Sequence, residues 1–375
     1  MKTILITGSE GFIGKNLSAR INEIQHYKII DFVRGDSDEY LKGSILSSDI
    51  IVHLAGENRP KESSSFIDVN IGLTSKICKF VSSSNKNIPI IFTSSTQANL
   101  ENDYGKSKLK AEEILKKFSK ESKNTVHIYR LPGVFGKWCK PNYNSVVATF
   151  CHNIANNLPI KIDDNNKKVN LVYIDDVIDS ILLDIDSSKE KFNFNKKIDN
   201  EYEISVGDLA NQIHSFKESR KSLITENVGT GLIRALYSTY ISYLNMKDFS
   251  YEIESHEDSR GNFVEMLKTR DSGQFSYFTA FPGITRGGHY HHTKTEKFLV
   301  IKGKAKFSFR NILTDESCSI ETSGKKPVIV ETIPGWSHDI KNIGQDEMIV
   351  MLWANEQFNR DAPDTIKSEV INEKT

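Results

Sequence analysis

The sequence has 375 residues, 38% of them hydrophobic and 26% charged, which is the composition of a globular chain with room for two or three domains. Forty-nine basic and forty-nine acidic residues cancel to a formal net charge of zero, which argues against nucleic acid as a main partner because phosphate neutralisation needs a basic surplus. The four cysteines are scattered and no apolar run reaches about eighteen residues, so we expect no disulfide framework, no membrane span and a cytoplasmic location.

The first half of the chain alternates short apolar runs with longer amphipathic stretches. Buried strands are predicted over Lys2–Thr7, Lys28–Val33, Ile50–Leu54 and Ile88–Ser94. Residues Leu109–Ser122 have the spacing of an amphipathic helix, whereas the polar stretches 163–168 and 194–203 predict exposed loops. This alternation predicts an α/β fold with a doubly wound, mostly parallel sheet of the Rossmann type.

A glycine-rich loop follows the first predicted strand and leads into a helix. Its sequence is Gly8-Ser9-Glu10-Gly11-Phe12-Ile13-Gly14. Glycines permit a tight turn and let backbone N–H groups and the helix dipole meet a pyrophosphate, so this context predicts a dinucleotide site. The candidate cofactor-binding residues of the loop are Gly8, Gly11, Phe12, Ile13 and Gly14.

Two residues near the end of the second predicted strand bear on the choice of cofactor. An acid such as Asp31 would bind a ribose 2′-hydroxyl, whereas an arginine such as Arg34 would accommodate a 2′-phosphate. If the strand runs through Val33, Asp31 lies inside it and Arg34 at its tip. The sequence therefore favours NADPH, with NADH as the alternative.

A tyrosine and a lysine with Tyr-x-x-x-Lys spacing follow the fourth predicted strand. Tyr104 and Lys108 would share one face of a helix. There the lysine charge, together with the cofactor's, would lower the phenol pKa and make the phenol a usable proton donor. A hydroxyl from the strand end Phe92-Thr93-Ser94-Ser95-Thr96 would hold a substrate carbonyl beside the tyrosine.

These motifs and three further stretches resemble the extended short-chain dehydrogenase/reductases that act on nucleotide sugars. The further stretches are His53-Leu54-Ala55-Gly56, Arg130-Leu131-Pro132-Gly133-Val134-Phe135-Gly136 and Val172-Tyr173-Ile174-Asp175-Asp176-Val177. The resemblance implies a catalytic triad of Ser95, Tyr104 and Lys108, with Ser94 and Thr96 flanking the hydroxyl position. It also implies cofactor contacts from Leu54, Ala55 and Lys108. Related 4,6-dehydratases carry an Asp-Glu pair where Thr96-Gln97 stands here, so ketone reduction is implied rather than elimination of water.

The character of the chain changes near residue 245, which predicts domains over 1–245 and 246–375. Evenly spaced strands without intervening helices suggest an antiparallel barrel or jelly roll. They are predicted over Phe275–Phe281, Lys297–Ile301, Lys304–Arg310, Val328–Thr332 and Met348–Trp353. Just before the boundary, Leu232–Leu244 predicts an amphipathic helix that packs within the first domain or forms a domain or subunit interface.

Histidines in the second predicted domain match the motifs of the cupin family. Gly283, His289, His291, Glu296 and Gly303 fit the first cupin motif, and Pro334-Gly335-Trp336-Ser337-His338, with Asn342, fits most of the second. Because His289 and His291 are two apart on a strand, both point to the same side. The predicted metal ligands are His289, His291, Glu296 and His338, whereas His292 points the other way. Three imidazoles and a carboxylate suit zinc, iron, manganese or nickel, and we favour zinc because nothing suggests redox chemistry.

A second resemblance overlaps the cupin motifs. The stretches Asp258-Ser259-Arg260-Gly261-Asn262-Phe263-Val264-Glu265 and Thr285-Arg286-Gly287-Gly288-His289-Tyr290 are similar to the deoxysugar 3,5-epimerases, which are themselves cupins. That resemblance implies that His289 is a base and that no metal is needed. A metal-bound imidazole cannot also accept a proton freely, so the two interpretations conflict. We favour metal binding because all four ligand positions are filled, and the epimerising base is then unassigned.

The combination resembles the CapF-type family of bifunctional capsular-polysaccharide enzymes over nearly the whole chain. The resemblance implies a UDP-2-acetamido-2,6-dideoxy-hexos-4-ulose substrate from the UDP-N-acetyl-L-fucosamine pathway. The cupin would invert carbon 3, and the reductase would then reduce the carbon-4 ketone with NADPH to give UDP-2-acetamido-2,6-dideoxy-L-talose. Members of both resembled families are commonly dimers, so a homodimer is expected. Three alternatives stay open: a structural or oligomerising cupin, a non-catalytic NAD(P)-sensing protein, and the same chemistry on another keto-sugar nucleotide.

Overall fold

The computed structural model of the protein describes residues 1–58, 66–122, 124–187, 193–253, 256–258, 261–263, 267–269, 273–356 and 361–370. Contacts divide the chain into two compact units. Unit 1 comprises Met1–Ser145 and Val169–Glu203, and unit 2 comprises Val146–Lys168 and Ile204–Thr375. The predicted boundary at residue 245 does not coincide with this division. A compact unit is defined by contacts and not by independent folding, so the two-domain division stays a prediction.

Unit 1 is a parallel sheet covered by helices on both faces. Its strands are β1 (Lys2–Thr7), β2 (Tyr27–Phe32), β3 (Ile50–His53), β4 (Ile90–Ser95), β5 (Val126–Leu131), β6 (Gly133–Phe135) and β8 (Asn193–Lys196). Its helices are α1 (Phe12–Asn22), α2 (Asp38–Leu46), η1 (Ile67–Gly72), α4 (Leu73–Ser83), η2 (Thr96–Asn99), α5 (Asp103–Ser122) and α7 (Ile174–Asp186). Strands β7 (Lys168–Tyr173) and β9 (Glu201–Ser205) straddle the limits of the unit.

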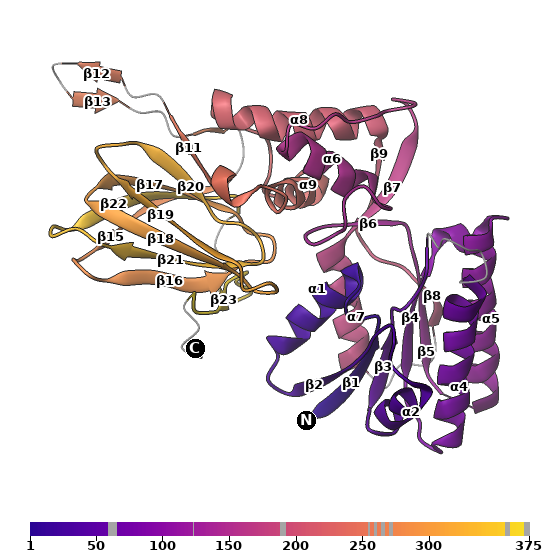
Figure 1. Ribbon diagram of the computed structural model, residues 1–375. Helices are drawn as coiled ribbons and strands as arrows, with labels where there is room; N and C mark the ends of the chain where they lie inside the picture. The colour runs from indigo at the N-terminus through magenta and orange to yellow at the C-terminus, as the bar shows by residue number, and fades with distance from the viewer. Residues whose placement is uncertain are drawn as a thin grey trace. The chain divides into compact units, whose positions relative to one another are not determined.

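The strand order of the main sheet is β2-β1-β3-β4-β5-β8, and the neighbouring strands pair in parallel. Helices α1 and α7 lie on one face, and α2, α4 and α5 lie on the other (Figure 1). Strands buried on both faces need apolar residues throughout, and Ile4, Leu5 and Ile6 are fully buried. The order reverses between β1 and β3, so the carboxyl ends of these strands form the crevice where such folds bind ligands.

Unit 2 contains two antiparallel sheets and a group of helices. Its helices are α6 (Val146–Ala155), α8 (Val206–Ser222), α9 (Gly231–Ile241) and η3 (Met246–Asp248). Its shorter strands are β10 (Ile224–Thr225), β11 (Ser250–Glu252), β12 (His256–Asp258), β13 (Gly261–Phe263), β14 (Lys268–Thr269) and β23 (Ile366–Lys367). Its longer strands are β15 (Gln274–Ala280), β16 (Thr285–Tyr290), β17 (Glu296–Lys302), β18 (Lys304–Asn311), β19 (Ser317–Ser323), β20 (Val328–Glu331), β21 (Trp336–Asn342) and β22 (Met348–Ala354).

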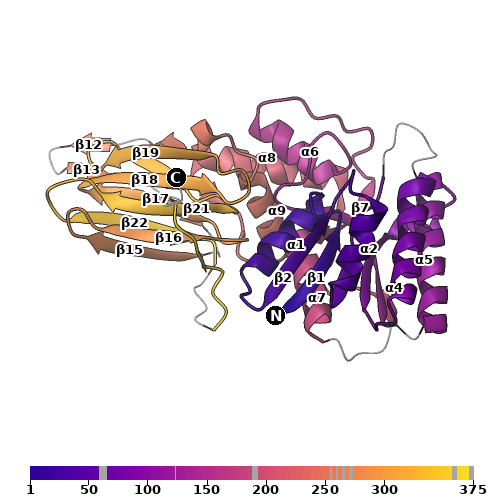
Figure 2. The ribbon, with the colours of Figure 1, turned by 60° about the horizontal axis from the view of Figure 1, so that its bottom comes forward.

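One sheet has the order β11-β20-β17-β22-β15 and the other has the order β19-β18-β21-β16-β23. The strands of the two sheets are stacked in Figure 2. Aromatic side chains meet between them, since the ring of Phe298 on β17 lies 5.6 Å from that of Phe307 on β18. The parallel N-terminal sheet and the antiparallel, cupin-like C-terminal sheets confirm the predicted fold class.

The predicted helix Leu232–Leu244 is α9, which ends at Ile241. It packs against the neighbouring helix through Tyr237, whose ring lies 5.2 Å from that of Phe216 on α8. It also contacts the β-structure, because the Ser238 hydroxyl donates to the backbone oxygen of Thr293 at 2.6 Å. Within the described residues, no helix is both long enough and apolar enough to cross a membrane.

Candidate active site and metal centre

The glycine loop turns tightly between β1 and α1, as the motif predicts. Gly8 has φ +74°, and a Cβ there would lie 2.9 Å from the backbone of Ala55. A Cβ on Gly14 would lie 2.3 Å from the backbone oxygen of Gly8. Side chains at either position would therefore push the loop away from β3 or away from its own helix. The loop is held closed by a hydrogen bond from the Gly11 N–H to the Gly8 oxygen, 3.0 Å long.

The first turn of α1 fits a pyrophosphate. Gly11 is its N-cap residue and supplies no side-chain hydrogen bond, and the turn contains no acidic residue. The free N–H groups and the positive end of the helix dipole are thus left for an anion. Phe12 and Ile13 begin the helix and are half-buried. The residues present therefore fit the dinucleotide that the loop predicts.

The residues that follow β3 lie next to the glycine loop. The N–H of Leu54 donates to the Thr7 backbone oxygen at 3.1 Å, and the N–H of Ala55 donates to the Thr7 hydroxyl at 3.2 Å. The same hydroxyl lies 2.7 Å from Nδ1 of His53. Burial, and then the Lys108 charge, lower the pKa of His53 to about 3, so this histidine is neutral near pH 7. The predicted cofactor residues Leu54 and Ala55 are therefore held beside Gly8.

The strand that carries Asp31 ends at Phe32, one residue earlier than Val33. Asp31 is exposed within β2, and Arg34 lies in the turn that follows. Gly8 is linked to this strand end, because its N–H donates to the Phe32 oxygen at 2.8 Å. Both candidate ribose-binding residues therefore lie near the glycine loop, and the choice between NADPH and NADH stays a prediction.

The predicted catalytic residues Ser95, Tyr104 and Lys108 come from the end of β4 and the first turns of α5. Burial raises the pKa of Tyr104, and a hydrogen bond with Ser95 opposes that rise. Lys108 is buried, and its Nζ donates to the Thr93 backbone oxygen at 3.0 Å. Burial lowers the pKa of Lys108 to about 8, opposed by the charge of Glu112. The structure thus brings the phenol and the serine hydroxyl together, with the lysine one helical turn away.

The two hydroxyls that flank Ser95 have other surroundings. The Ser94 hydroxyl donates to Glu112 at 2.6 Å, and Thr96 is exposed at the start of η2. The Glu112 carboxylate also accepts two hydrogen bonds from Arg130. Burial would raise the pKa of Glu112, but the Arg130 and Ser94 hydrogen bonds hold it below its usual value. Ser94 is therefore committed to this ion pair, which leaves Ser95 as the hydroxyl that contacts Tyr104.

The four predicted metal ligands come together in unit 2. The ligand atoms of His289, His291, Glu296 and His338 all lie within 4.8 Å of one another. Their strands meet because β16 pairs with β21, with His289 opposite His338. β16 ends at Tyr290, so His291 lies just past the strand, yet its ring is 5.0 Å from that of His289. Burial, and then the charges of His338 and His291, lower the pKa of His289 to about 3.

Two imidazoles are oriented for metal binding by backbone acceptors. Nδ1 of His291 hydrogen-bonds to the backbone oxygen of Asp364, and Nδ1 of His338 lies 3.4 Å from that of Trp336. A carbonyl only accepts, so each Nδ1 carries the proton and each Nε2 presents its lone pair to the cluster. Nε2 of His338 is buried and lies 3.5 Å from the Glu296 carboxylate, at the limit of a hydrogen bond. This donor set fits a divalent metal, and His292 is not part of it.

The stretch similar to the 3,5-epimerases is described only in part. Residues 259, 260, 264 and 265 lie outside the described residues. His256–Asp258 and Gly261–Phe263 form the antiparallel pair β12 and β13. The histidine shared by both interpretations, His289, lies in the metal cluster.

Two acidic residues at these sites were not predicted. Glu112 fixes Ser94, and it lies one helical turn beyond Lys108, a spacing that could have indicated it. Asp364 accepts hydrogen bonds from the backbone beside the metal cluster, but lies 68 residues beyond Glu296. No motif spacing connects it with the ligands.

The parallel sheet, the glycine loop and the Tyr–Lys pair define a dinucleotide-binding protein of the short-chain reductase class, joined to a cupin-like domain. Residues 4–195 match the family described as the NAD dependent epimerase/dehydratase family. Residues 256–366 match the family described as the polysaccharide biosynthesis C-terminal domain.

The chain is 53% identical over 367 residues to the UDP-2-acetamido-2,6-beta-L-arabino-hexul-4-ose reductase of Pseudomonas aeruginosa, with 98% of each chain covered. The crystal structure of the capsular polysaccharide assembling protein CapF from Staphylococcus aureus is 40% identical, with a TM-score of 0.68, and covers 98% of this chain and 100% of that chain. UDP-glucuronic acid 4-epimerase from Bacillus cereus, at 17% identity and a TM-score of 0.52 over 57% of this chain and 84% of that chain, shares the fold. The chain therefore belongs to the CapF-type family of capsular polysaccharide enzymes, which confirms the resemblance.

Proposed function

We propose that the chain is an NADPH-dependent nucleotide-sugar 4-ketoreductase whose cupin domain first epimerises carbon 3 of the same substrate. The relative from Pseudomonas aeruginosa is named as a reductase of a UDP-linked acetamido-hexul-4-ose. We transfer that substrate class to this chain, as a UDP-2-acetamido-2,6-dideoxy-hexos-4-ulose reduced to UDP-2-acetamido-2,6-dideoxy-L-talose for capsule synthesis. The proposed labour is divided between residues 1–245 and 246–375, in a cytoplasmic homodimer.

The placement of the Ser95 hydroxyl where it lowers the pKa of the Tyr104 phenol, with Lys108 buried on the same helix as Tyr104, is the observation that carries the reductase assignment. Ser95 and Tyr104 hold the carbon-4 oxygen, and Tyr104 donates its phenolic proton to that oxygen as the carbonyl is reduced. Lys108 places a positive charge near the phenol of Tyr104. This charge stabilises the phenolate that remains after Tyr104 has donated its proton. The nicotinamide cofactor, when bound, supplies the hydride to carbon 4.

The metal cluster supports the epimerase assignment. The carbon-3 hydrogen is acidic only while carbon 4 is a ketone, so inversion precedes reduction. A divalent metal held by His289, His291, Glu296 and His338, which we propose to be zinc, would supply Lewis-acid polarisation of the substrate. The protein's share is to bind the sugar, exclude water and orient the imidazoles through Asp364 and Trp336.

NADPH oxidation with a UDP-linked 4-keto-6-deoxy-N-acetylhexosamine tests both parts, when wild type is compared with His338→Ala. Oxidation by wild type, together with loss of the carbon-3-inverted product in the variant, is the expected result. If the His338→Ala variant still forms the carbon-3-inverted product, the cupin domain has a structural role and not a catalytic one. Absence of oxidation by wild type would exclude this substrate.

A further inference from the structure

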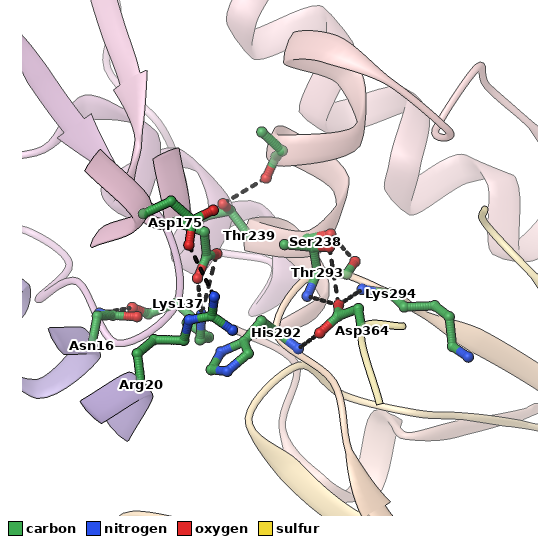
Figure 3. Close-up of polar contacts among 12 residues, drawn as sticks. Asn16, Arg20, Lys137, Asp175, Ser238, Thr239, His292, Thr293, Lys294 and Asp364 are labelled. Atoms are coloured by element: carbon green, nitrogen blue, oxygen red, sulfur yellow. Dashed lines mark hydrogen bonds and ion pairs between the residues drawn. The ribbon is translucent and has the colours of Figure 1, made fainter. Parts of the chain in front are cut away.

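We propose that Asp364 is a positioning residue that, together with helix α9, holds the segment between the metal ligands in its binding geometry. This segment, His291–Glu296, is called the ligand loop below, because it begins and ends with predicted ligands. The inference rests on the proposed metal site and concerns how that site is built. Figure 3 shows Asp364 among the residues of the loop, with Ser238 on the other side of Thr293.

Residues His291–Thr295 of the ligand loop are buried although they lie in neither a helix nor a strand, and Glu296 begins β17. His292, Thr293, Lys294 and Thr295 are each at most 8% exposed. Buried N–H groups outside regular structure need partners from side chains or water. Here side chains supply them, because the Thr295 N–H donates to Asn355 at 2.9 Å and the Glu296 N–H donates to the Thr332 hydroxyl at 2.9 Å.

Asp364 satisfies the three preceding N–H groups with one carboxylate. Its Oδ1 accepts from the His292 N–H at 2.8 Å. Its Oδ2 accepts from the N–H groups of Thr293 at 2.6 Å and Lys294 at 2.8 Å, and from the Thr293 hydroxyl at 3.0 Å. Hydrogen bonds to an ionised acceptor are shorter and stronger than neutral ones. This arrangement fixes the path of the loop directly after His291.

Asp364 is itself placed by β16, the strand that carries the ligand His289. β23 pairs with β16 so that Ile366 lies opposite Tyr290 and Lys367 opposite His289. The Ser368 N–H extends the pairing to the Gly288 oxygen at 2.8 Å. The backbone oxygen of Asp364 accepts the Nδ1 proton of His291, so one residue orients a ligand ring with its backbone and the ligand loop with its side chain.

Helix α9 holds the loop from another part of the sequence. Its Ser238 hydroxyl donates to the Thr293 oxygen at 2.6 Å, and Arg234 donates to the Thr293 hydroxyl. α9 lies between residues 195 and 256, outside both family matches. The ligand loop is therefore held in part by residues outside the family match that contains the predicted ligands.

Asp364→Asn is the sharpest test, because asparagine keeps the size and removes only the charge and one acceptor atom. In either amide orientation its NH2 group would face N–H donors, so at least one hydrogen bond is lost. Substitution of groups that orient metal ligands costs about 10- to 100-fold in metal affinity. Ser238→Ala, which removes one neutral hydrogen bond, should cost about two- to tenfold in the same direction.

The experiment measures zinc affinity of the full-length protein by competition with a chromophoric chelator, and records the visible spectrum of the cobalt-substituted protein. Matched controls are Asp346→Asn, an exposed loop position of the same domain, and Ser242→Ala, at the residue that follows α9. The Ser242 hydroxyl donates to the backbone oxygen of Thr239 in α9 and not to the ligand loop. Weaker zinc binding and an altered cobalt spectrum in Asp364→Asn and Ser238→Ala, with unchanged controls, are the expected results.

The possible failures are distinguishable. Wild-type protein that binds no zinc would overturn the metal site itself and with it this inference. Tight zinc binding by wild type and by both variants, with an unchanged cobalt spectrum, would overturn the positioning role alone, even if the variants melt at a lower temperature. If Asp364→Asn fails to fold, Ser238→Ala decides between the same two results.

Discussion

The guanidinium of Arg34 lies 2.6 Å from the carboxylate of Glu57, although the Arg34 side chain is 81% exposed. Glu57 is fixed by Asn70, which accepts its N–H at 2.8 Å and donates to its backbone oxygen at 3.0 Å. The pair thus links the turn after β2 to the segment after β3. The Glu57 side chain is only 13% exposed, so a 2′-phosphate must displace this carboxylate from the exposed Arg34 guanidinium or share the guanidinium with it.

Arg34→Ala should therefore reduce the preference for NADPH over NADH. Loss of a charge-assisted contact with the 2′-phosphate should lower the ratio of the two kcat/KM values by about 10- to 100-fold. Steady-state rates with each cofactor give the ratio, and Lys79→Ala, an exposed position on α4, is the control. An unchanged ratio would count against Arg34 as the phosphate-binding residue.

Tyr104→Phe should abolish reduction while it spares epimerisation. Removal of the proton donor should lower the rate of NADPH oxidation by about 10²- to 10⁴-fold. Exchange of the carbon-3 hydrogen with solvent deuterium, followed by mass spectrometry, should continue at the wild-type rate. Tyr40→Phe, at a half-exposed position on α2, should change neither reaction. Loss of exchange together with reduction would contradict the division of labour.

The reductase should lose activity as the pH rises through about 8. Burial lowers the pKa of Lys108 to about 8, so its ammonium charge is present below that pH and lost above it. Burial raises the pKa of Tyr104, so the phenol stays protonated over the same range. A profile of kcat/KM against pH should decline above about pH 8, and in Lys108→Arg, whose charge does not titrate, the decline should disappear. A flat wild-type profile would show that the lysine charge is not required.

Gly14→Ala should weaken cofactor binding and lower the melting temperature. The added Cβ would lie 2.3 Å from the Gly8 oxygen and 2.6 Å from Cα of Ser9, so the glycine loop must shift. NADPH fluorescence titration and thermal unfolding measure the two effects. Gly43→Ala is the control, because a Cβ on this α2 residue meets nothing within 4 Å and should stabilise by about 0.5–1 kcal/mol. Normal NADPH affinity in Gly14→Ala would contradict the assigned role of the loop.

The pattern of apolar residues was sufficient to predict the buried strands, but it was not sufficient to predict the elements that are rich in polar residues. β1 has the predicted bounds, Lys2–Thr7, because its apolar run is bounded by polar residues on both sides. α5 begins at Asp103, so one helix contains both the Tyr104–Lys108 turn and the amphipathic stretch Leu109–Ser122. Its polar first turn is stabilised by the Asn102 side chain, which accepts from the Gly105 N–H at 2.7 Å. The loop predicted over 194–203 was wrong in part. β8 and β9 lie there, and β8 is held by its pairing with β5 at the sheet edge and not by its own composition.

The residues of the candidate sites also fall into those that the sequence predicts and those that it does not. Tyr104, Lys108 and the histidines follow fixed spacings, because each set lies on one helix or on adjacent strands. Asp364 reaches the ligand loop only through the pairing of β23 with β16, and Glu57 reaches Arg34 only through the order of β2, β1 and β3. Such contacts depend on how the strands pair in the folded sheet, so no regular spacing in the sequence predicts them.

Helices α8 and α9 are covered on their inner side by the rest of unit 2, and the large side chains Phe216, Tyr237 and Tyr240 are each at most 2% exposed. Arg220 on α8 also lies 3.3 Å from the buried Glu331 on β20. A cupin exchanged between enzymes by recombination at residue 245 would leave these aromatic and charged surfaces without their counterparts. The compact unit that buries these side chains, Val146–Lys168 with Ile204–Thr375, is therefore larger than the matched C-terminal domain of residues 256–366, and an exchange that keeps the unit intact must include the additional segments.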